Sequence, residues 1–358
     1  MKPLVATSYN PYEWWYGHLC RAFMSETELR AFPVSTNQSP GYSWETPLRD
    51  LLRDDFAACQ VFFGSVSTLH PDLLELPFLT TLWSDYFPDP GPQEDILKLY
   101  DVLFVSCHEG IDLWKSRGVE EVHWLPFAFD DLLETKIPET REVELAFVGA
   151  INLPIHAIRR EYLGALVKRF RMNDFQRRYS QAEAGAVYAG AKMVVNITEL
   201  RGFNMRNFEA MGQGALLLTQ KTGYGIPEMF QDGVHLVVYD GIEDLVEKAT
   251  YYLQHEEERM RIAEAGQKEI LAKHTYRHRA QEFLRVAASY AGRRGIGRKR
   301  ANAARGYANF YRHQRRVDKL VEVLCGRGLD LQQRAEVLLQ TISCLGGLCR
   351  SGRTVNFH

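Results

Sequence analysis

Short apolar segments alternate with helical segments along this chain, and the alternation starts a second time after about residue 140. The apolar segments are rich in β-branched or aromatic residues and end at turn residues, as buried strands do. Regular strand–helix alternation predicts a parallel, doubly wound sheet. The expected strands of the first half are residues 3–9, 59–66, 77–84, 101–107 and 122–131; those of the second half are 143–150, 192–198, 215–219 and 235–240.

Two such series predict an α/β fold with two Rossmann-like domains that face a cleft, followed by a helical C-terminal extension. We place the first domain at residues 1–135 and the second at 136–280. The extension covers residues 281–358, where apolar residues recur at helical spacing. The segment 170–181 could contain a strand, but it is too polar for a strand to be predicted there.

The composition is that of an ordinary globular protein, with 46% hydrophobic and 25% charged residues among 358. The net charge of −2 gives no global field for nucleic acid or membranes. No apolar run is long enough to span a bilayer, and the N-terminus lacks the apolar stretch of a secretory signal. The six cysteines are scattered without a C-x-x-C pair, which favours reduced thiols over a metal site. We therefore expect a cytoplasmic protein that uses no metal and no cofactor.

Ligands of doubly wound sheets bind beyond the carboxyl ends of the strands, so the residues after each strand matter most. After the expected strand 192–198 the chain reads RGFNMRNFEAMGQGALLLT, residues 201–219. Asn204 is placed to cap a helix that begins at Met205, and the first turn of such a helix attracts a phosphate. Arg206 lies in that first turn and could contact a diphosphate. Glu209 lies one turn later and could accept hydrogen bonds from the two hydroxyls of a ribose.

The alternative for these two charges is an exposed i,i+3 ion pair on a helix surface. Their position after a strand and a glycine loop favours the ligand interpretation instead. We accordingly expect Arg206 and Glu209 to face the ligand rather than the core.

Residues 192–284 resemble the C-terminal domain of GT-B glycosyltransferases, and more narrowly the family named for the spore maturation protein CgeB. The motifs that carry the resemblance are NMRNFEAMGQGALLLT, MFQDG, YYLQHEEERMRIAEAG and HTYRHR, in this order. Residues 99–130 resemble the end of the N-terminal domain of that family. The resemblance implies a hexosyltransferase that uses a nucleoside-diphosphate sugar, with UDP as the expected carrier, and needs no metal.

The resemblance also assigns individual residues of the donor site. It places the ribose contact on Glu209 and close backbone approach at Gly149. Arg159 or Arg160 would help to hold the diphosphate, unless both belong to a solvated helix face. The loop TGYGIPE, with Gly225, would contact the donor through backbone groups. Many retaining relatives carry a second glutamate eight positions before Glu209; here that position is Arg201, so the stereochemical outcome is open.

The acceptor side is marked by His18, which follows the first strand. In inverting GT-B enzymes of the plant type, a histidine at this place is the general base, and an aspartate after a later strand orients it. Asp85 holds the equivalent position here. A buried histidine at a helix start is the alternative, and His108 and Glu109 are rival candidates. The aromatic residues nearby could stack on a sugar or belong to the core: Tyr12, Trp14, Trp15 and Tyr16.

Between residues 286 and 317 the chain carries nine lysines and arginines and no acid. This run could bind an acidic partner such as a lipid or nucleic acid, or be a solvated helix face. Two other functions stay open: a nucleotide-sugar epimerase of the same fold, and a binding module with a vestigial donor site. The acceptor could be a protein, a glycan or a small molecule.

Overall fold

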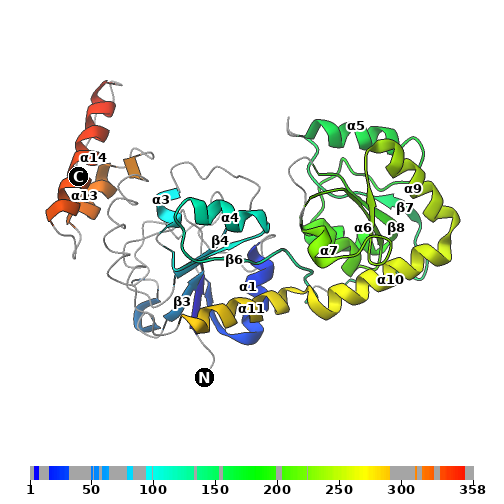
Figure 1. Cartoon of the computed structure of the whole chain (residues 1–358), viewed down its shortest axis with the longest axis horizontal. Helices are drawn as coiled ribbons and strands as arrows, with labels where there is room; N and C mark the ends of the chain where they lie inside the picture. The colour runs from blue at the N-terminus through cyan, green and yellow to red at the C-terminus, as the bar shows by residue number, and fades with distance from the viewer. Residues whose placement is uncertain are drawn as a thin grey trace. The chain divides into compact units, whose positions relative to one another are not determined.

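The computed structural model describes residues 4–7, 16–31, 50, 52–55, 59–63, 79–83, 94–98, 100–132, 135–152, 156–198, 204–223, 225–290, 311–312, 317–325 and 331–350. The chain forms two compact units (Figure 1). Unit 1 comprises residues 1–106, 110–125 and 283–358, and unit 2 comprises residues 107–109 and 126–282. Each unit is built around a parallel sheet, as the alternation of strands and helices predicts.

The sheet of unit 1 has the strand order β2-β1-β3-β4-β5-β6, and all neighbouring strands are parallel. The order reverses at β1, which lies between β2 and β3. The strands are β1 (Leu4–Thr7), β2 (Glu28–Ala31), β3 (Cys59–Phe63), β4 (Leu79–Trp83), β5 (Val102–Val105) and β6 (Val122–Trp124). Strand β2 was not expected, because its sequence ELRA lacks an apolar run.

The helices along this part of the chain are α1 (Tyr16–Glu26), the 3-10 turn η1 (Arg53–Asp55), α3 (Glu94–Leu97) and α4 (Glu109–Ser116). Gly118, at φ +89°, follows the end of α4, where a glycine in the left-handed conformation commonly terminates a helix. Helix α11 (Tyr276–Ser289) supplies Phe283 to the core of this unit. The Phe283 ring stacks on Phe104 at 5.0 Å and meets the edge of Phe23 at 4.8 Å. The chain ends in α13 (Val317–Cys325) and α14 (Leu331–Arg350).

The sheet of unit 2 has the order β10-β9-β8-β7, again with parallel neighbours. Its strands lie inside or beside the expected segments: β7 (Val143–Ala146), β8 (Ala191–Asn196), β9 (Leu216–Gln220) and β10 (Val237–Tyr239). On the side of β7 away from β8, Leu145 forms a bridge with Met172, within the segment whose structure was not predicted. The chain thus goes from β7 to one side and returns on the other side as β8, which makes β7–β8 the switch point of this sheet.

The helices of unit 2 are α5 (Ala157–Leu166), α6 (Gln181–Ala189), α7 (Met205–Gly212), α8 (Ile226–Met229), α9 (Ile242–Gln254) and α10 (Glu256–Lys273). Apolar residues of α5, α9 and α10 pack with the strands in a core that includes Phe147, Met193 and Leu216, all fully buried. The strands read as nearly continuous apolar runs because both faces of a parallel sheet are covered. The polar residues at their carboxyl ends are therefore exceptions that call for an explanation.

Candidate functional site

The switch point of unit 2 brings together the loop after β7, the end of β8 and the N-terminus of α7. The side chain of Asn204 accepts a hydrogen bond from the backbone N–H of Arg206 at 3.0 Å, which confirms the predicted cap. Asn204 also donates to the side-chain oxygen of Asn196 at 3.0 Å. The start of α7 is thus fixed to the end of β8, with its first turn at the edge where ligands of such sheets bind.

Arg206 is buried, with 8% of its surface exposed, and links the two strands of the switch point. It donates to the carbonyl oxygen of Val148 from Nε at 3.0 Å and from Nη2 at 2.6 Å. Its Nη1 donates to Asn196 at 2.7 Å, and its guanidinium lies 4.2 Å from the centre of the Phe147 ring. These contacts make Arg206 part of the frame of the site, rather than half of an exposed ion pair with Glu209.

Gly149 follows the carbonyl that Arg206 holds. A Cβ atom at this position would lie 2.3 Å from Nη2 of Arg206 and 3.1 Å from the Phe147 ring. The first distance is far inside van der Waals contact, so only glycine fits here without displacing the arginine. Gly149 itself is exposed, so its backbone is accessible to a ligand.

Three buried polar side chains close the network behind α7. Asn196 donates to Oδ1 of Asn207 at 3.1 Å and to Oγ1 of Thr219 at 3.2 Å, and the Thr219 hydroxyl donates to Asn207 at 3.1 Å. Tyr239 donates to the carbonyl oxygen of Asn196 at 2.9 Å. Asn196, Asn207 and Thr219 were not predicted from the sequence. For Asn196 and Thr219 the signal that could have found them is a polar residue at the end of an apolar strand, whereas Asn207 lies among other polar residues and gives no such signal.

Arg159 of α5 is 5% exposed and joins the loops after β7 and β8. It donates to the carbonyl oxygens of Ala150 at 2.5 Å and Ile197 at 3.2 Å, and lies 5.5 Å from the Phe147 ring centre. Arg160, its neighbour, donates to the carbonyl of Ile151 at 2.8 Å on the exposed side. Arg159 and Arg206 thus both lie over the ring of Phe147, and their positive charges lie beside the loops after β7 and β8. Phe147 was not predicted from the sequence to be part of a site.

Glu209 is half-buried on α7, one turn after Arg206. Burial raises the pKa of the Tyr188 phenol; the nearby Arg206 opposes this rise and the Glu209 carboxylate adds to it. Burial also raises the pKa of Tyr276, and Glu209 adds to that rise. The charge of the Glu209 carboxylate thus acts on two phenols that stay protonated at neutral pH.

Gly225, the other predicted donor contact, is the N-cap of α8 and has φ +81°. A side chain would strain this conformation, and Pro227 follows in the first turn of the helix. The chain therefore enters α8 through a backbone conformation that favours glycine.

His18 lies in the first turn of α1 and is 2% exposed. Nη2 of Arg21 lies 2.9 Å from its Nδ1, and since arginine only donates, Nδ1 is the acceptor. The neutral ring then carries its proton on Nε2. Asp85, Arg201, Gly202, Tyr12, Trp14 and Trp15 lie outside the described residues, as does the side chain of Tyr16. His108 is exposed, and Glu109 begins α4.

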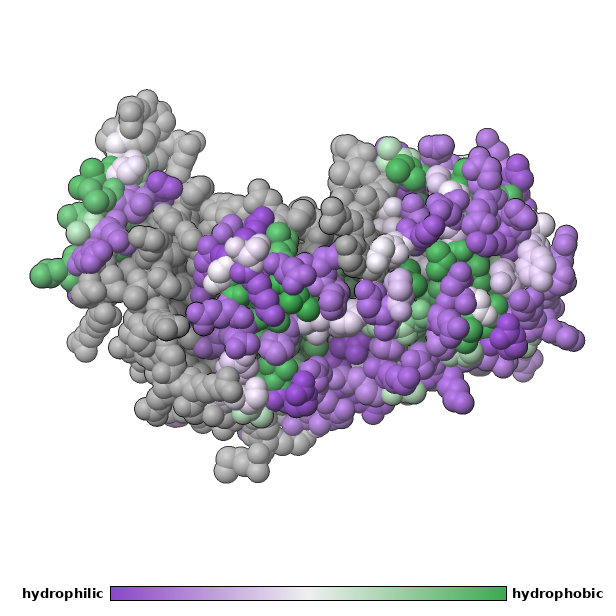
Figure 2. All heavy atoms as spheres, viewed as in Figure 1, coloured by the Kyte–Doolittle hydropathy of each residue, from purple (hydrophilic) through white to green (hydrophobic). Residues whose placement is uncertain are grey.

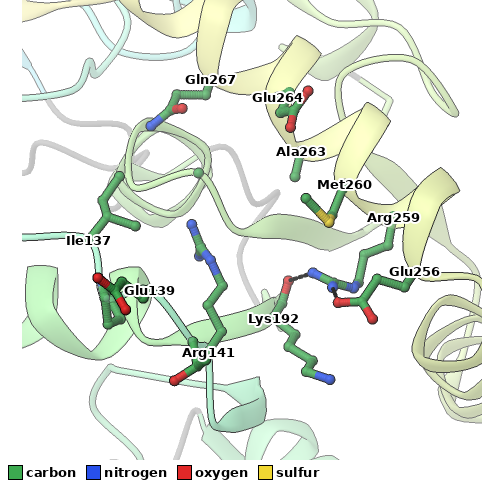
Figure 3. A pocket seen from close by; sticks show the side chains of 13 residues that line it. Ile137, Glu139, Arg141, Lys192, Glu256, Arg259, Met260, Ala263, Glu264 and Gln267 are labelled. Carbon is green, nitrogen blue, oxygen red and sulfur yellow. Dashed lines mark hydrogen bonds and ion pairs between the residues drawn. The ribbon is translucent and has the colours of Figure 1, made fainter.

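A pocket of about 460 Å³ lies at the opposite, amino end of the unit 2 strands (Figure 3). Arg141 enters it and donates to the carbonyls of Ala191 at 2.8 Å and Gln213 at 3.1 Å. Arg259 binds the carbonyl of Lys192 at 3.4 Å and the carboxylate of Glu256 at 2.8 Å, as the dashed lines show. Burial lowers the pKa of Arg141, and the charge of Arg259 adds to that effect. These arginines fasten the chain before β7 and α10 to the strand ends.

Among the described residues, no group of three or more histidine, cysteine or acidic side chains is placed to hold a metal ion. Five cysteines of the described part are free thiols: Cys20, Cys59, Cys107, Cys325 and Cys344. The helices described here include none with the length and apolar character needed to cross a membrane.

Residues 134–285 match a family model described as glycosyl transferase-like. That range contains the whole switch-point network. None of the curated proteins matches the sequence.

Among solved structures, HepE of Anabaena, determined with UDP and glucose, superposes with a TM-score of 0.55 at 12% identity; the match covers 81% of this chain and 100% of HepE. Sucrose-phosphate synthase of Thermosynechococcus elongatus gives a TM-score of 0.51 at 12% identity, over 81% and 99% of the two chains. A glycosyltransferase of Rickettsia africae ESF-5 gives 0.52 at 8% identity, over 81% and 99%. The chain has the GT-B fold of glycosyltransferases, and its residues 134–285 carry a glycosyl transferase-like domain.

Proposed function

We propose that this protein is a glycosyltransferase that moves a sugar from a nucleoside-diphosphate sugar to an acceptor. The observation that carries the proposal is the switch point of unit 2, where the bare backbone at Gly149 faces the capped start of α7. A helix N-terminus beside a glycine loop suits the diphosphate of such a donor, because free N–H groups and the helix dipole both favour an anion. The family match over residues 134–285 supports the same placement.

The roles of the residues follow from their geometry. The backbone amides of the loop after β7 and of α7 would hold the diphosphate, with Arg159 and Arg206 supplying positive charge behind them. Arg206 has further N–H groups beyond the three used in its bonds to Val148 and Asn196. Glu209 would bind the ribose hydroxyls, and Gly225 would present backbone groups to the donor.

We take UDP as the carrier and a hexose as the sugar. The support is that HepE, which shares the fold, was solved with UDP and also with UDP-glucose. Within the superfamily we assign the chain to the CgeB-like group, on the motif NMRNFEAMGQGALLLT. The leaving diphosphate would be stabilised without a metal, by the helix dipole and the arginines. The five free thiols fit the reducing cytoplasm, where we place the reaction.

Residues 1–135 would bind the acceptor, with His18 as the general base and Asp85 as the group that orients it. A base must have a free ring nitrogen directed at the acceptor hydroxyl. In the structure Nδ1 of His18 is engaged by Arg21, so this role requires the neutral ring to exchange its proton between the two nitrogens. The acceptor itself could be a protein, a glycan or a small molecule.

The experiment is a calorimetric titration of the full chain with UDP, UDP-glucose, GDP and uridine, followed by assay of UDP release. We expect UDP and UDP-sugars to bind more tightly than uridine, and the free diphosphate to appear slowly without acceptor. A ligand at about 100 times its Kd should add about 2.7 kcal/mol of stability. Absence of binding by every nucleoside diphosphate would contradict the proposal. Tight binding without any release of UDP would leave a binding module instead of an enzyme.

A further inference from the structure

The backbone of Phe147, two residues before Gly149, is held by a side chain from the segment that precedes α6. This side chain belongs to Asn173, which follows the bridge between Met172 and Leu145 on the side of β7 away from β8. Oδ1 of Asn173 accepts a hydrogen bond from the N–H of Phe147 at 2.9 Å, and Nδ2 donates to the Phe147 carbonyl at 2.9 Å. An asparagine side chain carries an amide group like that of the backbone. The Asn173 side chain therefore continues the pairing of β7 one residue past the end of the strand.

Asn173 differs from the polar residues around it, because it is half-buried and turned toward the sheet. Its Nδ2 also donates to the hydroxyl of Tyr179 at 3.3 Å, and that hydroxyl donates to the carbonyl of Asp174 at 2.8 Å. The other polar residues of the segment are exposed: Arg171, Asp174, Gln176, Arg177, Arg178 and Ser180. Hydrophilic residues cover much of the described surface of unit 2 in Figure 2. The polarity of this segment thus reflects its place at the surface, except at Asn173.

Phe147 is also the residue that both arginines of the switch point contact. Its ring centre lies 4.2 Å from the guanidinium of Arg206 and 5.5 Å from that of Arg159. The carbonyl of the next residue, Val148, accepts two hydrogen bonds from Arg206. Because the ring, this carbonyl and the exposed Gly149 are consecutive along the chain, a shift of the Phe147 backbone would move all three. Asn173 can thus act on the loop after β7 through Phe147, without contact to a ligand.

We propose that Asn173 is a positioning residue for the diphosphate of the donor. The inference rests on the proposed function, in which the backbone amides of the loop after β7 hold that diphosphate. Phe147 is fully buried, so loss of the Asn173 amide would leave its N–H and carbonyl without these partners in the interior. The loop would then have to be ordered by the ligand, at a cost in affinity. The nucleoside, whose ribose Glu209 would bind, does not depend on this loop.

The test is calorimetric titration of the full chain with UDP and with uridine. We expect Asn173→Ala to raise the Kd for UDP at least about tenfold and the Kd for uridine less than about threefold, since uridine has no phosphate. Asn173→Ser keeps a polar side chain that is too short to reach both groups of Phe147, and it should give the same result. This second variant serves if the alanine variant does not fold.

The matched control is Ser180→Ala, which removes the side-chain cap of α6 from the same segment and leaves both bonds to Phe147. This control should lower the melting temperature, measured by circular dichroism, while both Kd values stay within about threefold of the wild type. A loss of UDP affinity that Ser180→Ala reproduces would overturn the inference, because destabilisation of the segment would then explain it.

The two ligands separate this inference from the proposed function. If the wild type binds UDP but the Asn173 variants lose UDP and uridine equally, or lose neither, Asn173 does not position the diphosphate and the proposed function stands. If the wild type binds no UDP, both the proposed function and this inference are wrong.

Discussion

Arg206 donates two hydrogen bonds to the carbonyl oxygen of Val148, from Nε at 3.0 Å and from Nη2 at 2.6 Å, across 58 residues of sequence. The same guanidinium lies over the ring of Phe147. A charged side chain of one ligand-binding element thus fixes the backbone of another. The loop after β7 and the start of α7 therefore depend on each other for their positions.

Replacement of Gly149 by alanine should disrupt the link. The added Cβ would lie 2.3 Å from Nη2 of Arg206, so the arginine or the loop must move. We expect a loss of about 1–3 kcal/mol in unfolding free energy, typical of overpacking, and weaker UDP binding. In the Arg206→Ala background the same change should cost less, because the clash is gone. Denaturant unfolding of the four proteins measures this coupling; additive effects would show that the two residues do not interact.

Replacement of Arg206 by alanine should lower stability as well as affinity. The variant removes a buried cation and leaves the Val148 carbonyl without these two donors. We expect a loss of about 2–4 kcal/mol in unfolding free energy. Under conditions where the variant is folded, UDP should bind more weakly while uridine, which has no phosphate, is spared. Equal losses for UDP and uridine in calorimetry would mean that Arg206 acts only through the fold.

Replacement of Glu209 by alanine should weaken UDP and uridine alike, because both carry the ribose that the carboxylate would bind. Charged hydrogen bonds contribute about 1.5–3 kcal/mol, so the Kd should rise by about one to two orders of magnitude. Glu209→Gln keeps the shape of the side chain, so its Kd for UDP should lie between those of Glu209→Ala and the wild type. Calorimetric titration gives the values. An unchanged Kd in both variants would place the ribose elsewhere.

Replacement of His18 by alanine should abolish sugar transfer while leaving UDP affinity nearly intact, if His18 is the base. Arg21→Met is the matched control, because it removes the donor to Nδ1 and keeps the histidine. We expect this control to retain transfer, with a changed pH dependence of kcat. Transfer by His18→Ala at the wild-type rate would exclude His18 from the mechanism.

Stability should fall in mild acid because of His274. Burial lowers its pKa from 6.5 to about 4 in the folded protein, and the charge of Arg279, whose Nη2 lies 3.0 Å from Nδ1, adds to this effect. Between these two pH values the unfolded chain binds a proton that the folded chain does not. The neutral His274 therefore contributes on the order of 2–3 kcal/mol to the unfolding free energy above pH 6.5, and this contribution is lost as the pH falls toward 4.

Thermal unfolding between pH 7 and pH 4 measures this loss, and His274→Gln should reduce the slope. The variant should not abolish the dependence of stability on pH, because burial also lowers the pKa of His278. A slope that the variant leaves unchanged would show that His274 does not contribute.

The sequence predicted the elements of the fold better than the contacts of the site. Apolar runs such as that of β9 identify strands because burial on both faces leaves no other composition. Asn204 was recognisable as a cap because capping is a local interaction. The short β2 and the bridge at Met172 were missed because neither has an apolar run to mark it.

The hydrogen-bond acceptors of Arg206 could not be predicted from the sequence. Its acceptors are a backbone carbonyl after β7 and a side chain at the end of β8, and only the folded sheet brings them together. The pairing with Glu209 suggested by their spacing is a local pattern, and the longer-range contacts determine where the guanidinium lies. The contacts of Arg159 could not be predicted either, because both of its hydrogen-bond acceptors are main-chain oxygens that only the folded sheet brings close to it.

The closed triangle of Asn196, Asn207 and Thr219 has a consequence for how a ligand would bind. Each amide is held in one orientation, because the Thr219 hydroxyl must donate to Asn207 if it accepts from Asn196. Helix α7 is thus preorganised, and a nucleotide would not have to order it on arrival. The entropy lost on association should come from the ligand more than from this helix, and the heat capacity change should report only the apolar surface that the ligand covers.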